Sequence, residues 1–130
     1  MTEAALYEVV GGMPFFVALV DSFYALVAVD PVLLALYPEQ VDLAPARERL
    51  SLFLAQYWGG PTTYSDARGH PRLRMRHGPF RIGTVERDHW LAAMDNALNE
   101  LAPADDIRAR LDAYFVMAAD AMRNVEEVTP

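Results

Sequence analysis

Apolar side chains recur every three to four residues along most of the chain, which is the spacing of helices that bury one face. Runs of alternating β-branched residues, which are typical of strands, do not occur. The pattern predicts helices over residues 3–10, 15–29, 45–58, 84–101 and 103–124. The helix over 15–29 carries apolar residues around most of its circumference, so we expect it at the centre of the fold. The predicted class is therefore all-α.

Glycine and proline mark where several helices begin and end. Gly11-Gly12 ends the first helix, and Asp30-Pro31 is typical of an N-cap followed by a first-turn proline, which starts a short turn. Residues 61–71 contain turn residues without periodicity, so we predict a long loop there. Loops of that length inside a compact domain are often functional. A short helix is predicted over residues 71–77.

The length of 130 residues predicts one domain over residues 1–130, and a composition of 53% hydrophobic and 22% charged residues suffices to bury a core. Eleven basic and eighteen acidic residues give a net charge of −7, which disfavours binding to nucleic acids and to anionic membranes. The longest apolar stretch, residues 13–20, is too short to span a bilayer. The absence of cysteine suits a reducing compartment, so we expect a cytoplasmic protein.

All eleven basic residues are arginines, and several gather between residues 64 and 84. A planar guanidinium matches a carboxylate or a phosphate with two hydrogen bonds, so a bound anion is one reason for such a cluster. A solvated helix face with surface ion pairs is the other, and the pattern leaves both open. The arginine cluster consists of Arg68, Arg72, Arg74, Arg76 and Arg81.

His77 is the best metal-ligand candidate among the three histidines, because a neutral imidazole suits iron or zinc and a helix break follows at Gly78-Pro79. The alternative is a structural histidine that the dipole of a helix C-terminus favours. His89 is interpreted as part of a polar helix flank. A zinc site has no support, since the chain has neither cysteine nor a His-Glu-x-x-His motif.

Three polar aromatic residues stand out: Tyr24 on the central apolar helix, Tyr37 at the end of the short turn, and Trp90 on the apolar face of the helix predicted over 84–101. A buried phenol or indole needs a hydrogen-bond partner, because an unsatisfied polar group costs about 1–3 kcal/mol. Each residue can bond a backbone carbonyl, or all three can converge on one ligand. The three residues by themselves leave both alternatives open.

Several short motifs and two long segments follow one another along almost the whole chain. The short motifs are Tyr7 with Gly11-Gly12, Phe23-Tyr24, Asp30-Pro31 and Tyr37-Pro38. The long segments are 52–61 (LFLAQYWGGP) and 69–82 (GHPRLRMRHGPFRI), and Arg87-Asp88-His89-Trp90 follows them. In this order and at this spacing they resemble the second group of the truncated haemoglobins, the O-type of actinobacteria.

The resemblance implies a two-over-two helical sandwich around haem b, with His77 as the proximal ligand of the iron. It implies that Tyr24, Tyr37 and Trp90 lie on the distal side. Trp90 and Tyr37 then donate hydrogen bonds to bound dioxygen and slow its release, because an indole N–H and a phenol O–H both suit its partial negative charge. The resemblance also places Ala46 and Leu50 at the distal pocket, Arg49, Arg76 and Tyr64 at the haem propionates, and Phe53, Leu54 and Leu73 as further cofactor contacts.

The expected function is that of a haem protein whose five-coordinate iron binds dioxygen, and also carbon monoxide and nitric oxide. Slow release argues against bulk oxygen transport. One alternative is a redox enzyme that uses the same haem as a nitric oxide dioxygenase or a peroxidase, for which a reductase that the sequence does not identify must supply electrons. Another is a haem-free helical interaction domain whose arginine cluster binds an acidic partner. Whether the chain forms a homo-oligomer is left open.

Overall fold

The computed structural model describes residues 5–37, 42–70 and 82–124. Within these ranges the chain forms helices and no strand, which confirms the all-α prediction. The helices are α1 (Leu6–Val9), α2 (Met13–Val27), α3 (Pro31–Leu34), α4 (Ala44–Tyr57), α5 (Thr63–Arg68), α7 (Thr84–Leu101) and α8 (Asp105–Ala121). In the part of the chain that is described, none of them is long and apolar enough to cross a membrane.

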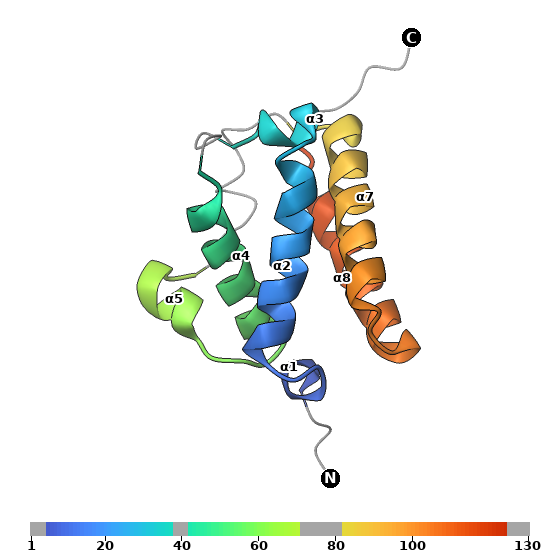
Figure 1. Ribbon diagram of the computed structural model, residues 1–130. Coiled ribbons are helices and arrows are strands. Elements are labelled where there is room, and N and C mark those ends of the chain that lie inside the picture. The colour runs from blue at the N-terminus through green and yellow to red at the C-terminus, as the bar shows by residue number, and fades with distance from the viewer. Residues whose placement is uncertain (1–4, 38–41, 71–81, 125–130) are drawn as a thin grey trace.

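Two pairs of helices make up the body of the fold. Helix α2 packs against α4 and α7, and α7 packs against α8. Figure 1 shows α2 and α4 running in opposite directions on one side, and α7 and α8 running in opposite directions on the other. This arrangement is the predicted two-over-two sandwich.

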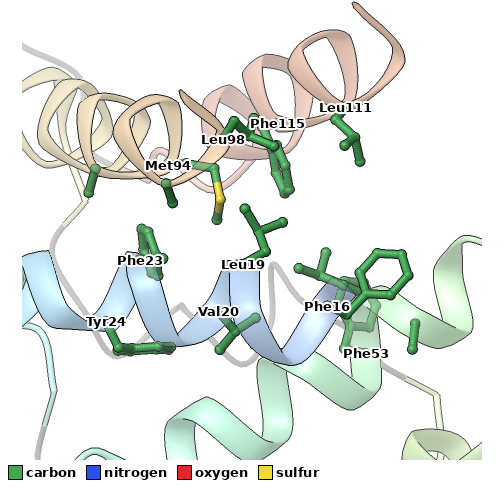
Figure 2. Packing of buried hydrophobic residues seen from close by; sticks show 14 of the residues in the cluster. Phe16, Leu19, Val20, Phe23, Tyr24, Phe53, Met94, Leu98, Leu111 and Phe115 are labelled. Carbon is green, nitrogen blue, oxygen red and sulfur yellow. The ribbon is translucent and has the colours of Figure 1, made fainter. Parts of the chain in front are cut away.

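Helix α2 is buried on two faces, as its apolar circumference predicts. Phe16, Leu19, Val20 and Phe23 are fully buried. Figure 2 shows Leu19 and Phe23 pointing toward α7 and α8, whereas Val20 and Tyr24 lie on the side of α4. One helix therefore contributes to the packing of both pairs.

The long helices follow their predictions closely. Helix α7 has the predicted bounds, and α2 and α4 begin two residues and one residue earlier than predicted. Helix α8 begins at Asp105 instead of residue 103, and Asp105 and Asp106 then form its first turn, where acidic side chains complement the helix dipole. The helix predicted over 71–77 lies outside the described residues.

The structure shows that the predicted irregular loop over 61–71 was wrong over most of its length, because helix α5 occupies it. This helix has six residues and buries only Tyr64, so it leaves no apolar periodicity to detect. Two hydrogen bonds hold it to α4: Gln56 Nε2 donates to Ser65 Oγ at 2.6 Å, and Ser65 N donates to Gln56 Oε1 at 3.0 Å. Tyr64 is therefore fixed in position relative to α4.

The end of α4 lies close against the N-terminal helix. The Tyr7 N–H donates to the carbonyl of Trp58 at 3.0 Å, and the Gly60 N–H donates to the carbonyl of Ala55 at 2.7 Å. A Cβ at Gly60 would lie 2.6 Å from the Tyr7 ring and 2.7 Å from the Ala55 oxygen. Glycine is required there because the neighbouring chain leaves no room for a side chain.

Two hydrogen bonds join the chain just before α7 to the chain just after α8. The Ile82 N–H donates to Asn124 Oδ1 at 2.9 Å, and the Asn124 N–H donates to the Ile82 carbonyl at 2.9 Å. Ile82 is 7% exposed, so its N–H has little access to water. The Asn124 side chain therefore satisfies a backbone donor that would otherwise be buried without a partner.

We expect Asn124→Ala to lower the free energy of unfolding by about 1–2 kcal/mol, because the Ile82 N–H loses its acceptor. Asn124→Asp is the matched control, since it keeps an acceptor oxygen in the same place and should remain closer to the parent protein. Urea unfolding followed by circular dichroism measures both. Equal stability of Asn124→Ala and the parent protein would contradict this account.

Candidate functional site

A cavity of about 510 Å³ lies among α2, α4, α7 and α8. This volume lies within the range of cofactor and ligand pockets, about 300–1,000 Å³. Most of its lining is apolar, and a few polar groups converge on it, as is typical of sites that hold an organic cofactor.

Most of the residues that the sequence analysis singled out line this cavity. They are Tyr24, Tyr37, Ala46, Arg49, Leu50, Phe53, Leu54, Tyr64 and Trp90. The structure therefore brings together side chains from α2, α4, α5 and α7 with Tyr37, which follows α3. The other three candidates, Leu73, Arg76 and His77, lie outside the described residues.

Helix α8 contributes to the cavity, which the sequence pattern did not predict. Tyr114, Phe115, Ala118 and Met122 line the cavity, and Ile82 joins them from the chain before α7. Tyr114, Phe115 and Ala118 of α8 and Met122, which directly follows it, belong to an apolar stripe with helical spacing. Such a stripe predicts burial, but it does not distinguish a side chain that packs in the core from one that borders a cavity.

The two phenols of Tyr24 and Tyr37 meet at the cavity. Their hydroxyl oxygens lie 3.3 Å apart, with one hydroxyl donating to the other, and their ring centroids lie 5.6 Å apart. Burial raises the pKa of Tyr24 far above its ordinary value. Burial also raises the pKa of Tyr37, against the opposing effects of its hydrogen bond to Tyr24 and of the positive charge of Arg49. Both phenols therefore stay protonated at neutral pH, and only one of the two hydroxyl protons is used between them.

Trp90 brings an indole to the same cavity from α7. Its ring packs edge-on against Phe23 of α2 at 5.3 Å and lies 5.7 Å from Phe115 of α8. Contacts from two other helices therefore restrict its orientation. The indole N–H can donate a hydrogen bond and cannot accept one.

Arginines provide the positive charge at the cavity. Arg49 comes from α4, and Arg68 from the end of α5, where its guanidinium lies 5.9 Å from the centroid of the Tyr64 ring. Arg87 is engaged by Asp120 at 2.9 Å and by Asp88 at 3.1 Å.

The acidic side chain at the cavity also has a hydrogen-bond partner. Glu86 is the acidic residue in the lining, and its carboxylate accepts the N–H of Gly83 at 2.9 Å at the start of α7. An apolar cavity with guanidinium groups at its edge and hydroxyl groups inside fits a flat, apolar macrocycle that carries carboxylates. The described residues therefore fit the expected haem.

His89 has a role that the sequence analysis did not predict. It was interpreted as part of a polar flank, but its Nδ1 lies 2.8 Å from Asp30 Oδ2. This hydrogen bond is the main cause that lowers the pKa of Asp30 below its ordinary value. The two residues lie 59 positions apart, so no local pattern indicates their contact.

Comparison with known proteins identifies relatives over nearly the whole chain. Residues 5–124 match the model of the family described as bacterial-like globin. The group 2 truncated haemoglobin YjbI of Bacillus subtilis is 37% identical over 123 residues, which cover 95% of this chain and 91% of that protein.

Solved structures agree with the sequence comparison. The thermostable haemoglobin of the actinobacterium Thermobifida fusca has a TM-score of 0.92 and 56% identity, covering 95% of this chain and 100% of that one. The truncated oxygen-avid haemoglobin of Bacillus subtilis has a TM-score of 0.87 and 37% identity, covering 93% of this chain and 100% of that one.

The raised pKa of Tyr24 predicts how stability changes in alkali. Above pH 10, the ordinary pKa of the group, an unfolded chain releases this proton while the folded protein retains it, so stability falls as the pH rises. We expect Tyr24→Phe to make this fall in stability less steep, by about 0.7 kcal/mol per pH unit near pH 10 and approaching about 1.4 kcal/mol per pH unit well above it, because one retained proton is removed. Urea unfolding at several pH values between about 9 and 11 measures the slope with which the free energy of unfolding changes with pH.

Tyr57→Phe is the matched control, because the Tyr57 ring is 50% exposed and lies outside the cavity lining. It should leave the slope close to that of the parent protein. An identical slope for Tyr24→Phe and the parent protein would rule out a buried, protonated Tyr24.

Proposed function

Because the chain belongs to the bacterial-like globin family and, within it, to the group 2 truncated haemoglobins, we propose that it is a haem b protein that binds dioxygen and releases it slowly. The family implies a haem cofactor and the binding of diatomic gases. The choice of oxygen, the iron ligand and the roles of individual residues are our proposal. The observation that carries it is the convergence of Tyr24, Tyr37 and Trp90 on one apolar cavity.

When bound, haem would supply an iron atom that an imidazole can ligate and that can bind a diatomic gas. We assign the imidazole to His77. Within the described residues, neither His70 nor His89 is among those that line the cavity, and His89 is bonded to Asp30. His77 belongs to the segment between α5 and α7, two helices that both contribute side chains to the cavity.

The haem carboxylates are assigned to arginines. Arg49 and Arg68 line the cavity from α4 and α5, and a guanidinium can bind a carboxylate through two hydrogen bonds. Tyr64 lies beside Arg68 and adds a hydroxyl at the same edge. Arg76, which lies outside the described residues, completes the proposed set. Arg68 is an addition to the residues that the resemblance implies.

The gas-binding side is assigned to the polar aromatic residues. Ala46 and Leu50 line this region and have no polar side-chain atom, so they donate no hydrogen bond to a ligand. Trp90 supplies an indole N–H, and the pair Tyr24 and Tyr37 supplies the hydroxyl proton that is not used between them. Donors in a cavity of low polarity act strongly on the partial negative charge of dioxygen. Slow release follows, and the oxygen-avid relative in Bacillus subtilis supports this assignment.

Absorption spectra test the cofactor and its ligand. We expect the purified protein to show a haem band that shifts when carbon monoxide is added to the reduced form. His77→Ala should lose or alter this band, because the iron loses its imidazole. His70→Ala is the control and should retain the parent spectrum. A parent protein that neither contains nor takes up haem would refute the proposed function, and an unaltered His77→Ala spectrum would refute the assignment of the ligand.

Oxygen release tests the donors. We expect Trp90→Phe to raise the oxygen dissociation rate about tenfold, the size expected when a hydrogen bond of about 1.4 kcal/mol is lost. Stopped-flow mixing of the oxygenated protein with an oxygen scavenger measures this rate. Trp58→Phe is the matched control, since Trp58 is not among the described residues that line the cavity. An unchanged rate in Trp90→Phe would remove Trp90 from the donor set.

A further inference from the structure

One carboxylate, that of Asp30, holds helix α3 and contacts helix α7 at the same time. Its Oδ1 accepts the N–H of Val32 at 2.9 Å and the N–H of Leu33 at 3.4 Å, which caps the start of α3. Its Oδ2 lies 2.8 Å from Nδ1 of His89 on α7. The cap fixes the orientation of the carboxylate, so the second oxygen is directed at His89.

Both ends of this hydrogen bond adjoin residues of the cavity. Trp90 follows His89 directly on α7. Tyr37 ends the short segment that Asp30 begins. Within this segment the Leu36 N–H donates to the Leu33 carbonyl at 3.0 Å, and the Tyr37 N–H donates to the Leu34 carbonyl at 3.1 Å. These hydrogen bonds fix the backbone between Asp30 and Tyr37.

Helix α3 depends on its contacts because it has only one turn. It comprises Pro31–Leu34, and it packs against both α7 and α2. Figure 1 shows α3 beside the first turns of α7, where His89 and Trp90 lie. The position of α3 relative to α7 sets the distance between Tyr37 and Trp90, because each of these two residues is attached to one of the two elements.

We propose that the hydrogen bond between Asp30 and His89 positions Tyr37 and Trp90 relative to each other, which makes His89 a positioning residue for gas retention. The proposal rests on the proposed function, in which Tyr37 and Trp90 act on the bound gas. His89 and Asp30 do not themselves line the cavity. They act through the residues that follow them in the chain.

The contact differs from an ordinary surface ion pair, which contributes little because two mobile side chains must be ordered. The Asp30 side chain is 24% exposed and is already ordered by its role as a cap, so its bond to His89 requires the ordering of one side chain only. The neighbouring acidic side chains on α7 have other partners: the Glu86 carboxylate accepts the N–H of Gly83, and Asp88 pairs with Arg87.

A matched pair of variants at His89 tests the proposal. In His89→Asn the side-chain amide nitrogen stands near the place of Nδ1 and can donate to Asp30, whereas His89→Leu has the same branched shape without a donor. We expect His89→Leu to raise the oxygen dissociation rate about threefold, a smaller change than the direct loss of a donor, because Trp90 and Tyr37 remain but are less well placed. His89→Asn should restore a rate close to that of the parent protein.

Asp30→Ser tests the other side of the contact. Serine is a favoured N-cap residue, so α3 keeps its cap while the second oxygen that meets His89 is lost. We expect the same rise in rate as in His89→Leu, and no further rise when both changes are combined, because both remove one interaction. Urea unfolding of the parent protein, His89→Leu, Asp30→Ser and the double variant should show a coupling free energy between residues 30 and 89, and this measurement does not depend on gas kinetics.

The C–O stretching frequency of the carbon monoxide complex separates positioning from stability, because it responds to the donors around the gas. A shifted or broadened band in His89→Leu that returns in His89→Asn supports the proposal. Lower stability of His89→Leu with an unchanged band and an unchanged rate shows a structural contact only, and overturns it. Trp90→Phe separates a failure of the positioning role of His89 from a failure of the proposed function. If Trp90→Phe changes the oxygen dissociation rate and His89→Leu does not, the positioning role alone is refuted. If Trp90→Phe leaves the rate unchanged, the donor role of Trp90 is refuted, and the positioning role with it.

Discussion

The fold depends on the burial of α2 on two faces at once. Leu19 and Phe23 fill the space toward α7 and α8, while Val20 and Tyr24 lie on the side of α4. The helices that make the hydrophobic core are therefore the same helices that enclose the cavity. Because a close-packed core resists deformation, the cavity walls share its rigidity. The polar side chains that the long helices bring to the cavity, those of Tyr24 and Trp90, are consequently held by the core itself.

The polar groups of the cavity are placed where an apolar environment changes their chemistry. Tyr24 is 4% exposed, and its hydroxyl pairs with that of Tyr37. A phenol in such surroundings keeps its proton and remains a hydrogen-bond donor over a wide pH range. Among the described residues that line the cavity, positive charge comes from Arg49 of α4, Arg68 of α5 and Arg87 of α7, and Arg87 is paired with acidic side chains. The site thus combines neutral donors with guanidinium groups, which suits a cofactor with an apolar centre and acidic substituents.

Periodicity predicts the long helices of this chain because each buries a stripe of several turns. It fails for α5, whose six residues bury only Tyr64, and it does not indicate that Tyr114 and Phe115 border a cavity. Contacts between distant residues escape it entirely, as His89 with Asp30 shows. The cofactor and most site residues were predicted through the resemblance to a known family, since the motifs carry information that spacing does not. The roles of those residues, and of His77 in particular, stay predictions.

The pairing of Ile82 with Asn124 closes the chain from the start of α7 to the end of α8 into a loop, because two hydrogen bonds join its ends across 42 positions. Proteins open in contiguous cooperative units, and a helical hairpin whose ends are joined is suited to be one of them. Fraying of the end of α8 would then require the entrance to α7 to open as well. Because Ile82 lines the cavity, this pairing also ties part of the cavity wall to the end of the hairpin.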